Sequence, residues 1–389
     1  MIGLIGPDAF DRANPGPTSN PGRHVISTVT RGVRIAGTQT AVPQTSRAIL
    51  DDGIFDDAQE AQRVGASIGV RARRIASRET TTSDLCAAAA RSLMDQLGWA
   101  PDSVDIVVFV TQSSDYIIPA TACVLQERLG LSQGAAFDVN LGCSGYVYGL
   151  WMTAQLLQSL ADSGRPGRAL LLAGDISTSK LRPDDRGTIP LFGDAGSATA
   201  LERSADASPM YGVFGTDGRG AEHLIIRAGA MRDPLLPQVP RRSEEEEARL
   251  FKESRLHLNG AEVFGFTLRI VPPLIESALN AAGITVDAVD HFVFHQANTF
   301  IINHLRKKAK LPAEKVPVAM EEFGNTSSAS IPLTMAHALA GPLSLETRKL
   351  VLAGFGVGWS WGALALDVGP IPTPKVVELP DPAVQTAAE

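Results

Sequence analysis

The chain has 389 residues and a formal net charge of −7; 44% of its residues are hydrophobic and 20% are charged. This composition is typical of a globular protein, and the acidic balance argues against nucleic-acid binding, which needs clustered cations. The three cysteines show no metal-ligand spacing, so we expect neither a metal site nor a disulfide framework. The apolar runs are too short to cross a bilayer, and no signal-peptide pattern is present. These features predict a cytoplasmic protein without a membrane partner.

In chain order, the predicted organisation begins with residues 1–26, a Pro-, Gly- and Asn-rich segment that we interpret as a flexible arm. A first α/β unit is predicted over residues 27–205, and a second over residues 206–369. The proline-rich residues 370–389 are interpreted as a flexible tail. The chain is therefore expected to fold as two units between two loose ends.

Two apolar segments recur in the same order in both units. Residues 168–174 (RALLLAG) match 348–354 (RKLVLAG), and residues 104–109 (VDIVVF) match 289–294 (VDHFVF). Short runs rich in Val, Leu and Ile are typical of strands buried on both faces, as in a parallel sheet. Helical patterns precede the second pair of strands, at residues 83–97 and 273–282. Alternating strands and helices indicate βαβ units, so the sequence predicts an α/β fold built from two copies of one unit. The alternative is that short apolar segments of similar sequence recur by chance.

An insertion at residues 232–255 contains four consecutive glutamates, residues 244–247. A like-charge run is typical of a solvated helix face or an exposed loop. We favour that interpretation; a flap near an active-site entrance is the alternative.

Cys143 and Asn325 occupy nearly equivalent places in the two units. Each follows a predicted strand and a glycine-containing turn, stands at the start of a predicted helix, and precedes one of the two matched RxLxLAG strands. A helix N-terminus stabilises a thiolate, which is the nucleophilic form of cysteine. A buried structural cysteine is the alternative, and it describes Cys86 and Cys123 better than Cys143. Cys143 is therefore the candidate nucleophile.

His295 directly follows the predicted strand at 289–294, at the edge where α/β folds place their sites. Taken alone, such a residue is more often a structural histidine. Residues 354–362 (GFGVGWSWG) form a glycine-rich turn without the lysine of a P-loop or the spacing of a dinucleotide fingerprint. Their backbone N–H groups are suited to an oxyanion instead, so no cofactor is predicted.

Five motifs together give the chain a family resemblance over residues 30–368. They are DVNLGCSG around Cys143, DDRGTIPLFGDAGSA from Asp184, HQAN from His295, FGNTSSASIP from Phe323 and GFGVGWSWG from Gly354. The chain resembles the β-ketoacyl-acyl-carrier-protein synthase III group of the thiolase superfamily. The resemblance implies a five-layered αβαβα fold built from two duplicated halves, and a homodimer.

The resemblance also implies the chemistry. Cys143 would be acylated by a primer thioester and would then undergo decarboxylative Claisen condensation with a malonyl thioester, in fatty-acid, polyketide or secondary-metabolite synthesis. His295 and Asn325 would donate hydrogen bonds to the enolate oxygen, and the backbone N–H groups of Cys143 and Gly358 would form the oxyanion hole.

Further positions are implied for the substrates, which would be acyl-coenzyme A or acyl-carrier-protein thioesters. Arg186 and Asn298 match positions that line the coenzyme A and pantetheine tunnel. Arg63 and Ser67 replace the Trp and Arg with which the family clamps adenine. The primer is therefore expected to arrive on a carrier protein, or coenzyme A binds differently.

Ile117 and Ile118 stand where the family closes the acyl pocket across the dimer. The alternative to condensation is an acyltransferase that moves the acyl group from Cys143 to an alcohol or an amine. A hydroxymethylglutaryl-coenzyme A synthase would need a glutamate before the nucleophile, where the sequence offers only Asp115. A non-catalytic partner subunit typically lacks the cysteine.

Overall fold

The computed structural model describes residues 25–131, 134–160, 164–235 and 243–382. Most of the predicted arm, up to residue 24, and the end of the predicted tail, from residue 383, lie outside the described residues. No helix in the described part of the chain is long and apolar enough to cross a membrane.

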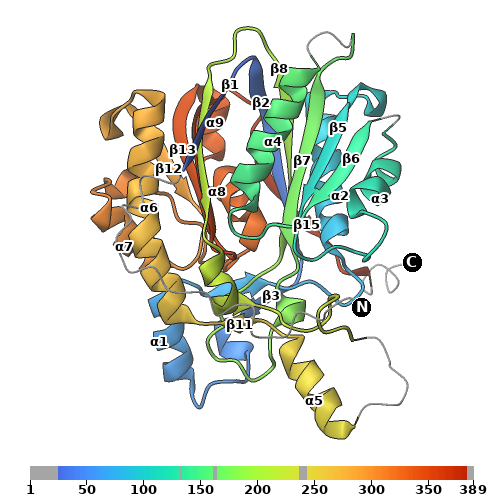
Figure 1. The fold of residues 1–389 in the computed structure, drawn as a ribbon, viewed down its shortest axis with the longest axis vertical. Coiled ribbons are helices and arrows are strands. Elements are labelled where there is room, and N and C mark those ends of the chain that lie inside the picture. The colour runs from blue at the N-terminus through green and yellow to red at the C-terminus, as the bar shows by residue number, and fades with distance from the viewer. Residues whose placement is uncertain (1–24, 132–133, 161–163, 236–242, 383–389) are drawn as a thin grey trace, which may run out of the picture.

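Two mixed β-sheets lie at the centre of the molecule (Figure 1). The first has the strand order β15-β2-β8-β7-β5-β6, and the second has the order β1-β9-β14-β13-β12. The strands are β1 (Ile26–Thr30), β2 (Val33–Pro43), β5 (Ile106–Val110), β6 (Ala135–Val139), β7 (Arg168–Asp175), β8 (Ala195–Arg203), β9 (Met210–Thr216), β12 (His291–Phe294), β13 (Arg348–Gly356), β14 (Ser360–Val368) and β15 (Lys375–Leu379).

The series β2-β8-β7-β5 of the first sheet is repeated as β9-β14-β13-β12 in the second. In each series the first two pairs are antiparallel and the third is parallel. The two matched sequence segments form the parallel pairs, β5 with β7 and β12 with β13. The predicted duplication is therefore confirmed, although both sheets are mixed, because β8 and β14 run antiparallel to their neighbours.

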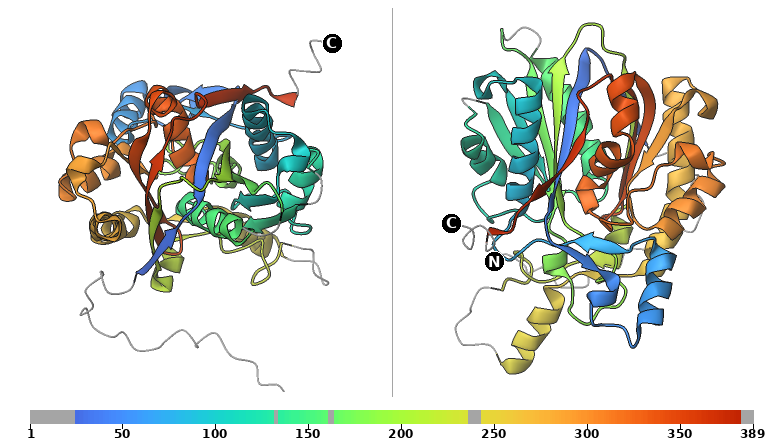
Figure 2. Two further views of the ribbon diagram at one scale, coloured as in Figure 1. Left: turned by 90° about the horizontal axis from the view of Figure 1, so that it is seen from above. Right: turned by 180° about the vertical axis from the view of Figure 1, so that it is seen from behind.

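Helices form three layers around the sheets (Figures 1 and 2). The bounds are α2 (Thr82–Leu97), α3 (Thr121–Arg128), α4 (Gly145–Ser159), α6 (Gly260–Ala282), α7 (Thr299–Lys308), α8 (Ser330–Ala338) and α9 (Ala340–Leu345). Helices α2 and α3 pack on the first sheet, and α6, with α7 beside it, packs on the second. Helices α4 and α8 contact strands of both sheets and lie between them. This is the five-layered arrangement that the resemblance predicted.

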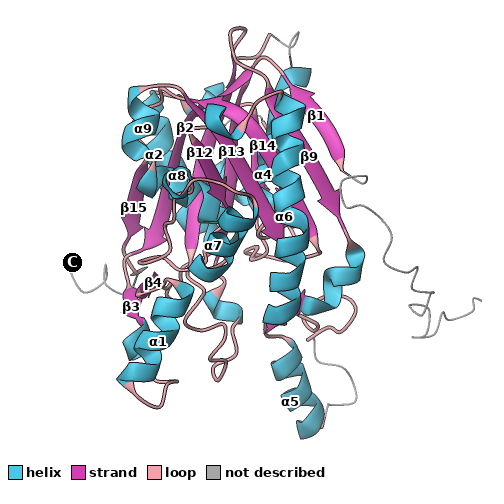
Figure 3. Ribbon diagram, turned by 90° about the vertical axis from the view of Figure 1, so that its left-hand side faces the viewer, coloured by secondary structure: helices cyan, strands magenta, loops and turns pink. Residues whose placement is uncertain are grey.

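Smaller elements gather at one end of the sheets (Figures 1 and 3). They are β3 (Ser46–Ala48), α1 (Ala58–Ile68), β4 (Ala72–Arg74), β10 (Leu224–Ile225), α5 (Glu244–Glu253) and β11 (His257–Leu258). Helix α5 contains the four glutamates, all exposed, with Ser243 as the N-cap. Their exposure confirms the solvated-helix interpretation. Acidic side chains in the first turn also stabilise the helix through its dipole.

The first and last strands of the described chain each pair with the sheet of the other half, which the sequence-based division into two units did not predict. Strand β1 belongs to the predicted first unit but pairs with β9 of the second sheet. Strand β15, within the predicted tail, pairs in parallel with β2 of the first sheet. The prediction of a flexible tail is therefore wrong for residues 375–379. The physical reason is that Val376 and Val377 are half-buried and pack against two different core clusters.

Two further predictions differ from the structure. Helix α6 begins at Gly260, well before the predicted start, and contains Pro272 and Pro273 in its interior. The strand predicted before Asn325 is absent: residues 318–320 form no regular secondary structure, and an isolated bridge joins Asn325 itself to Phe192. The second sheet therefore lacks a counterpart of β6.

Candidate active site

A cavity of about 1540 Å³ lies beside Cys143. Its walls include the loops that follow β5 and β7, and both ends of the predicted insertion through Leu235 and Ser254. The insertion thus has a solvated helix, as favoured, and its ends at Leu235 and Ser254 also border the cavity. Among the described residues, no group of three His, Cys, Asp or Glu side chains could hold a metal ion.

Cys143 stands immediately before Ser144, the N-cap of helix α4, as the sequence predicts. Its side chain is half-buried. Gly356, at the end of β13, lies directly against it: a Cβ added there would lie 2.6 Å from Cβ and 2.9 Å from Sγ of Cys143. Only glycine at that position leaves the thiol its room.

The thiol of Cys143 is surrounded by protein on most sides, and this burial raises its pKa to about 11. The negative charge of Asp175 acts in the same direction. Interactions with the backbone of Val357 and of Cys143 itself, and with the side chain of Ser327, lower the pKa by less. Burial is therefore the largest influence on this pKa, and it favours the neutral thiol.

His295 follows β12 and is 2% exposed. Burial lowers its pKa to about 4, so the ring is neutral near pH 7. The Ser330 hydroxyl lies 2.8 Å from Nδ1 and accepts a hydrogen bond from the Gln296 N–H at 3.3 Å. A hydroxyl group both donates and accepts, so Ser330 is able to donate to Nδ1 while it accepts from Gln296, an arrangement that leaves the ring proton on Nε2.

Asn325 is held by its backbone and by its side chain. Its N–H donates to the carbonyl of Leu191 at 2.8 Å, and its carbonyl accepts from Gly193 at 3.2 Å. The side-chain Oδ1 accepts from the Ser327 N–H at 2.9 Å, while Nδ2 donates to the Ala297 carbonyl at 3.3 Å. These bonds fix the amide with its donor group on the side of the HQAN segment.

Ser327 joins the three predicted catalytic residues, and sequence reasoning missed it. Its side chain acts on the thiol of Cys143 and its main chain on the ring of His295, lowering the pKa of the first and raising that of the second, and its N–H donates to Oδ1 of Asn325 at 2.9 Å. The residue has φ 51°, a left-handed conformation that is uncommon for serine and is found at functional sites. The structure thus brings Cys143, His295 and Asn325 together around one residue.

Arg73 is a buried residue that hydrogen-bonds the backbone next to Asn325. It is 2% exposed and binds Asp52 through two hydrogen bonds, of 3.0 and 2.8 Å. Its Nε also donates to the carbonyl of Phe192 at 3.1 Å, at the residue that bridges to Asn325. A bidentate buried pair gives a fixed geometry, so Arg73 fixes the backbone on which Asn325 rests.

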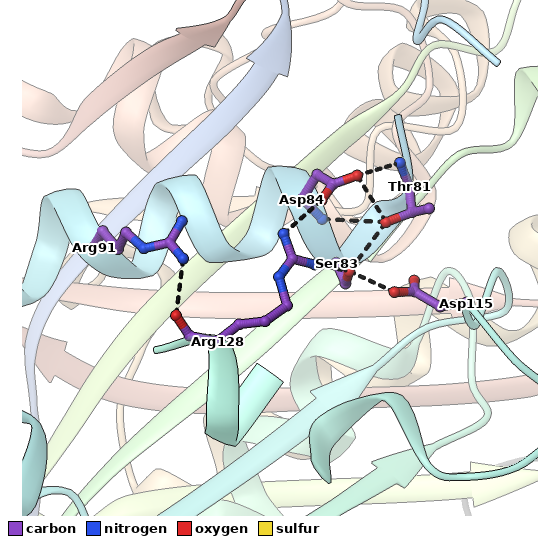
Figure 4. Close-up of polar contacts among 6 residues, drawn as sticks. All are labelled: Thr81, Ser83, Asp84, Arg91, Asp115 and Arg128. Carbon is purple, nitrogen blue, oxygen red and sulfur yellow. Dashed lines mark hydrogen bonds and ion pairs between the residues drawn. The ribbon is translucent and has the colours of Figure 1, made fainter. Parts of the chain in front are cut away.

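Asp115, the only acid in the loop after β5, accepts a hydrogen bond from helix α2 (Figure 4). Ser83 donates to Asp115 at 2.6 Å, and Arg128 binds both Ser83 and Asp84. Asp84 in turn completes the capping box with Thr81 at the start of α2. This network positions the loop that carries Ile117, and it places Asp115 in a structural role.

The two predicted tunnel residues have structural partners. Arg186 is exposed and forms ion pairs with Asp56 at 2.8 Å and Glu60 at 3.2 Å. Asn298 is the N-cap of α7 and accepts from the Ile301 N–H at 2.7 Å. Neither residue is among the described residues that line the cavity. Their role in lining a tunnel for the substrate therefore stays a prediction.

The remaining predicted site residues are Ile117 and Ile118 of the acyl pocket and Gly358 of the oxyanion hole. Ile117 lines the cavity and is 93% exposed, and Ile118 is 83% exposed. Gly358 has φ 130° in the turn after β13, but in the described structure Val357 rather than Gly358 borders the cavity and approaches the thiol. A single sequence gives no signal that separates these adjacent residues, because only the turn geometry decides which N–H points inward.

Comparisons with known proteins give the family to which the chain belongs. Residues 137–218 match the family model of 3-oxoacyl-[acyl-carrier-protein] synthase III, and residues 279–368 match the model of its C-terminal part. The chain is 35% identical to a β-ketoacyl-[acyl-carrier-protein] synthase III of Symbiobacterium thermophilum, covering 87% of this chain and 99% of the relative.

Solved structures are similar as well. A 3-oxoacyl-(acyl-carrier protein) synthase from Burkholderia xenovorans has 41% sequence identity and a TM-score of 0.83, over 91% of this chain and 99% of that one. The priming β-ketosynthase of the R1128 polyketide pathway has 27% identity and a TM-score of 0.75, over 88% and 98%. Fold and cysteine site together define a condensing enzyme of the acyltransferase type. The chain belongs to the β-ketoacyl-acyl-carrier-protein synthase III family.

Proposed function

We propose that Cys143 carries the primer acyl group and that His295 and Asn325 activate the malonyl thioester. The observation that carries this proposal is the convergence of all three residues on Ser327. In the first step Sγ attacks the carbonyl carbon of the primer thioester and the carrier thiol leaves with the thiol proton. Acylation on cysteine divides a difficult condensation into two easier steps.

In the second step the malonyl carboxylate leaves as carbon dioxide, and its electron pair forms the enolate of the remaining acetyl thioester. The Nε2–H of neutral His295 and the Nδ2–H of Asn325 donate to the enolate oxygen. Neutral donors fixed in a water-poor site stabilise developing charge efficiently. The carbanion equivalent attacks the acyl carbon, and the sulfur of Cys143 departs.

The oxyanion hole at the acyl-Cys143 carbonyl is proposed to use the N–H of Cys143 and that of Val357. This replaces Gly358 by its neighbour, since Val357 is the residue whose backbone approaches the sulfur. Gly358, with φ 130°, then serves to form the turn that aims the Val357 N–H.

We also propose acyl-carrier-protein thioesters as donors, with malonyl-carrier protein as the extender, and a homodimer as the working unit. The engagement of Arg186 by two carboxylates, and Arg63 and Ser67 in place of the adenine clamp, disfavour binding of coenzyme A in the manner implied by the family. The exposed Ile117 and Ile118 are apolar enough to be covered by a partner subunit. The cytoplasm, where these thioesters are formed, is the proposed compartment.

Condensation and acyl transfer are distinguished by carbon dioxide release. Protein acylated on Cys143 is mixed with malonyl-carrier protein, and carbon dioxide and β-ketoacyl product are measured together. We expect both products, and we expect Asn325→Ala to reduce condensation by at least about tenfold more than Cys143 acylation, because the amide acts only on the enolate. Formation of an ester or an amide on an added acceptor, without carbon dioxide release, would support acyl transfer instead.

A further inference from the structure

Lys180 is a half-buried cation in the wall of the cavity that contains Cys143. It ends the short 3₁₀ helix Thr178–Lys180 that follows β7. Its Nζ donates to the main-chain carbonyl of Gln112, in the loop after β5. Gln112 in turn lies next to the nucleophile, since a Cβ added to Gly142 would collide with its Oε1. Lys180 and Cys143 therefore line the same cavity, with Gln112 between them.

Within the protein, this ammonium has no carboxylate bound to it. Among the ion pairs of the described residues, none includes Lys180. Asp175 is the acid whose charge acts on both Lys180 and Cys143. Its two oxygens already accept hydrogen bonds from the Gln112 N–H at 2.7 Å and the Ser328 hydroxyl at 2.9 Å, and three further donors approach them.

Burial lowers the pKa of Lys180, and the charge of Asp175 offsets this only in part. A desolvated cation without a paired anion is costly, and a bound carboxylate would remove that cost. The cavity wall is apolar over most of its surface, which suits the methylene groups of an acyl chain, and Lys180 places a cation within that wall.

The cavity wall as a whole carries more positive than negative side chains. Arg47 and Arg78 also line it, both exposed, and neither takes part in an ion pair among the described residues. Of the acids in the wall, Asp52 is bound by Arg73, while Asp115 and Asp175 accept hydrogen bonds from uncharged groups only. Across the whole wall the cations Arg47, Arg73, Arg78, Lys180 and Arg182 outnumber these three acids, and an excess of positive charge favours an anionic ligand.

We propose that Lys180 binds a carboxylate at the far end of the primer, so that Cys143 is acylated preferentially by short dicarboxylic monothioesters. This rests on the proposed acylation of Cys143 and specifies the substrate class of that same site. Lys180 is a specificity-determining residue in this account. It contacts the end of the acyl chain, while the thioester carbonyl stays at Cys143.

Succinyl- and butyryl-thioesters test the proposal, because they have the same chain length and differ by a carboxylate in place of a methyl group. The full-length protein is incubated with each, as its carrier-protein and its coenzyme A thioester, without a malonyl donor, and the rate of Cys143 acylation is followed by intact mass. We expect succinyl to be preferred, and Lys180→Met to lower the succinyl-to-butyryl rate ratio by at least about tenfold. Lys180→Arg should retain part of the preference, because it keeps the charge.

Lys252→Met on the exposed face of α5 is the matched control and should leave the ratio unchanged. A ratio that favours butyryl in the unmodified protein, or one that Lys180→Met does not alter, would overturn the role of Lys180 and leave the nucleophile in place. The absence of any Cys143 adduct from either acyl group on either carrier would overturn the proposed function as well.

Discussion

At the scale of single residues, the site depends on small polar groups that orient larger ones. Ser327 links the nucleophile to both proposed enolate donors, and the Ser330 hydroxyl is the hydrogen-bond partner of Nδ1 of His295. Cys143, His295 and Asn325 could be selected from the sequence because they stand in motifs after predicted strands. Ser327, Val357 and Lys180 could not, since their roles come from a left-handed φ, the direction of one N–H and a contact between two loops.

The raised pKa of Cys143 leads to a prediction about pH. In the free protein the neutral thiol predominates below pH 11, so the thiolate fraction should rise about tenfold per pH unit between pH 7 and 9. The alkylation rate of Cys143 by iodoacetamide should therefore rise about 100-fold over this range. Peptide mapping separates Cys143 from the exposed Cys123. A rate that levels off near pH 7 would show that the helix start outweighs burial.

At the scale of elements, the duplicated strands were predictable because each is a short apolar run with the same neighbours. Strand β15 was not, since its five residues lie among prolines and form a strand only through pairing with β2. Helix α6 was predicted too short, because Pro272 and Pro273 interrupt the helical pattern in the sequence. Tertiary packing, which a propensity does not report, decides such segments.

The contribution of β15 can be measured with one substitution. Val376→Asp places a charge at a half-buried site against Val42 and Phe323, and we expect it to destabilise the protein by about 1–3 kcal/mol. Thermal unfolding should show a lower midpoint than in the control Lys375→Gln, which alters an exposed residue of the same strand. Equal midpoints for both variants would mean that β15 adds nothing to stability.

At the scale of the whole molecule, the duplication explains where the site lies. The equivalent loops of the two halves meet at one end of the two sheets, so the turn that carries Cys143 in the first half faces the Asn325 turn of the second. Gly142 illustrates this closeness: a Cβ added to it would lie 3.5 Å from Oγ of Ser327. The sequence predicted the repeat and hence the fold, but the cavity wall formed by the insertion appeared only in three dimensions.

The central claim is that Cys143 carries the acyl group as a thioester. Intact-mass measurement of the protein after incubation with a panel of acyl-coenzyme A and acyl-carrier-protein thioesters tests it most directly. We predict a single acyl adduct that hydroxylamine removes and that is lost in Cys143→Ala, while Cys123→Ala retains it. An adduct of the same mass and yield in Cys143→Ala would contradict the account.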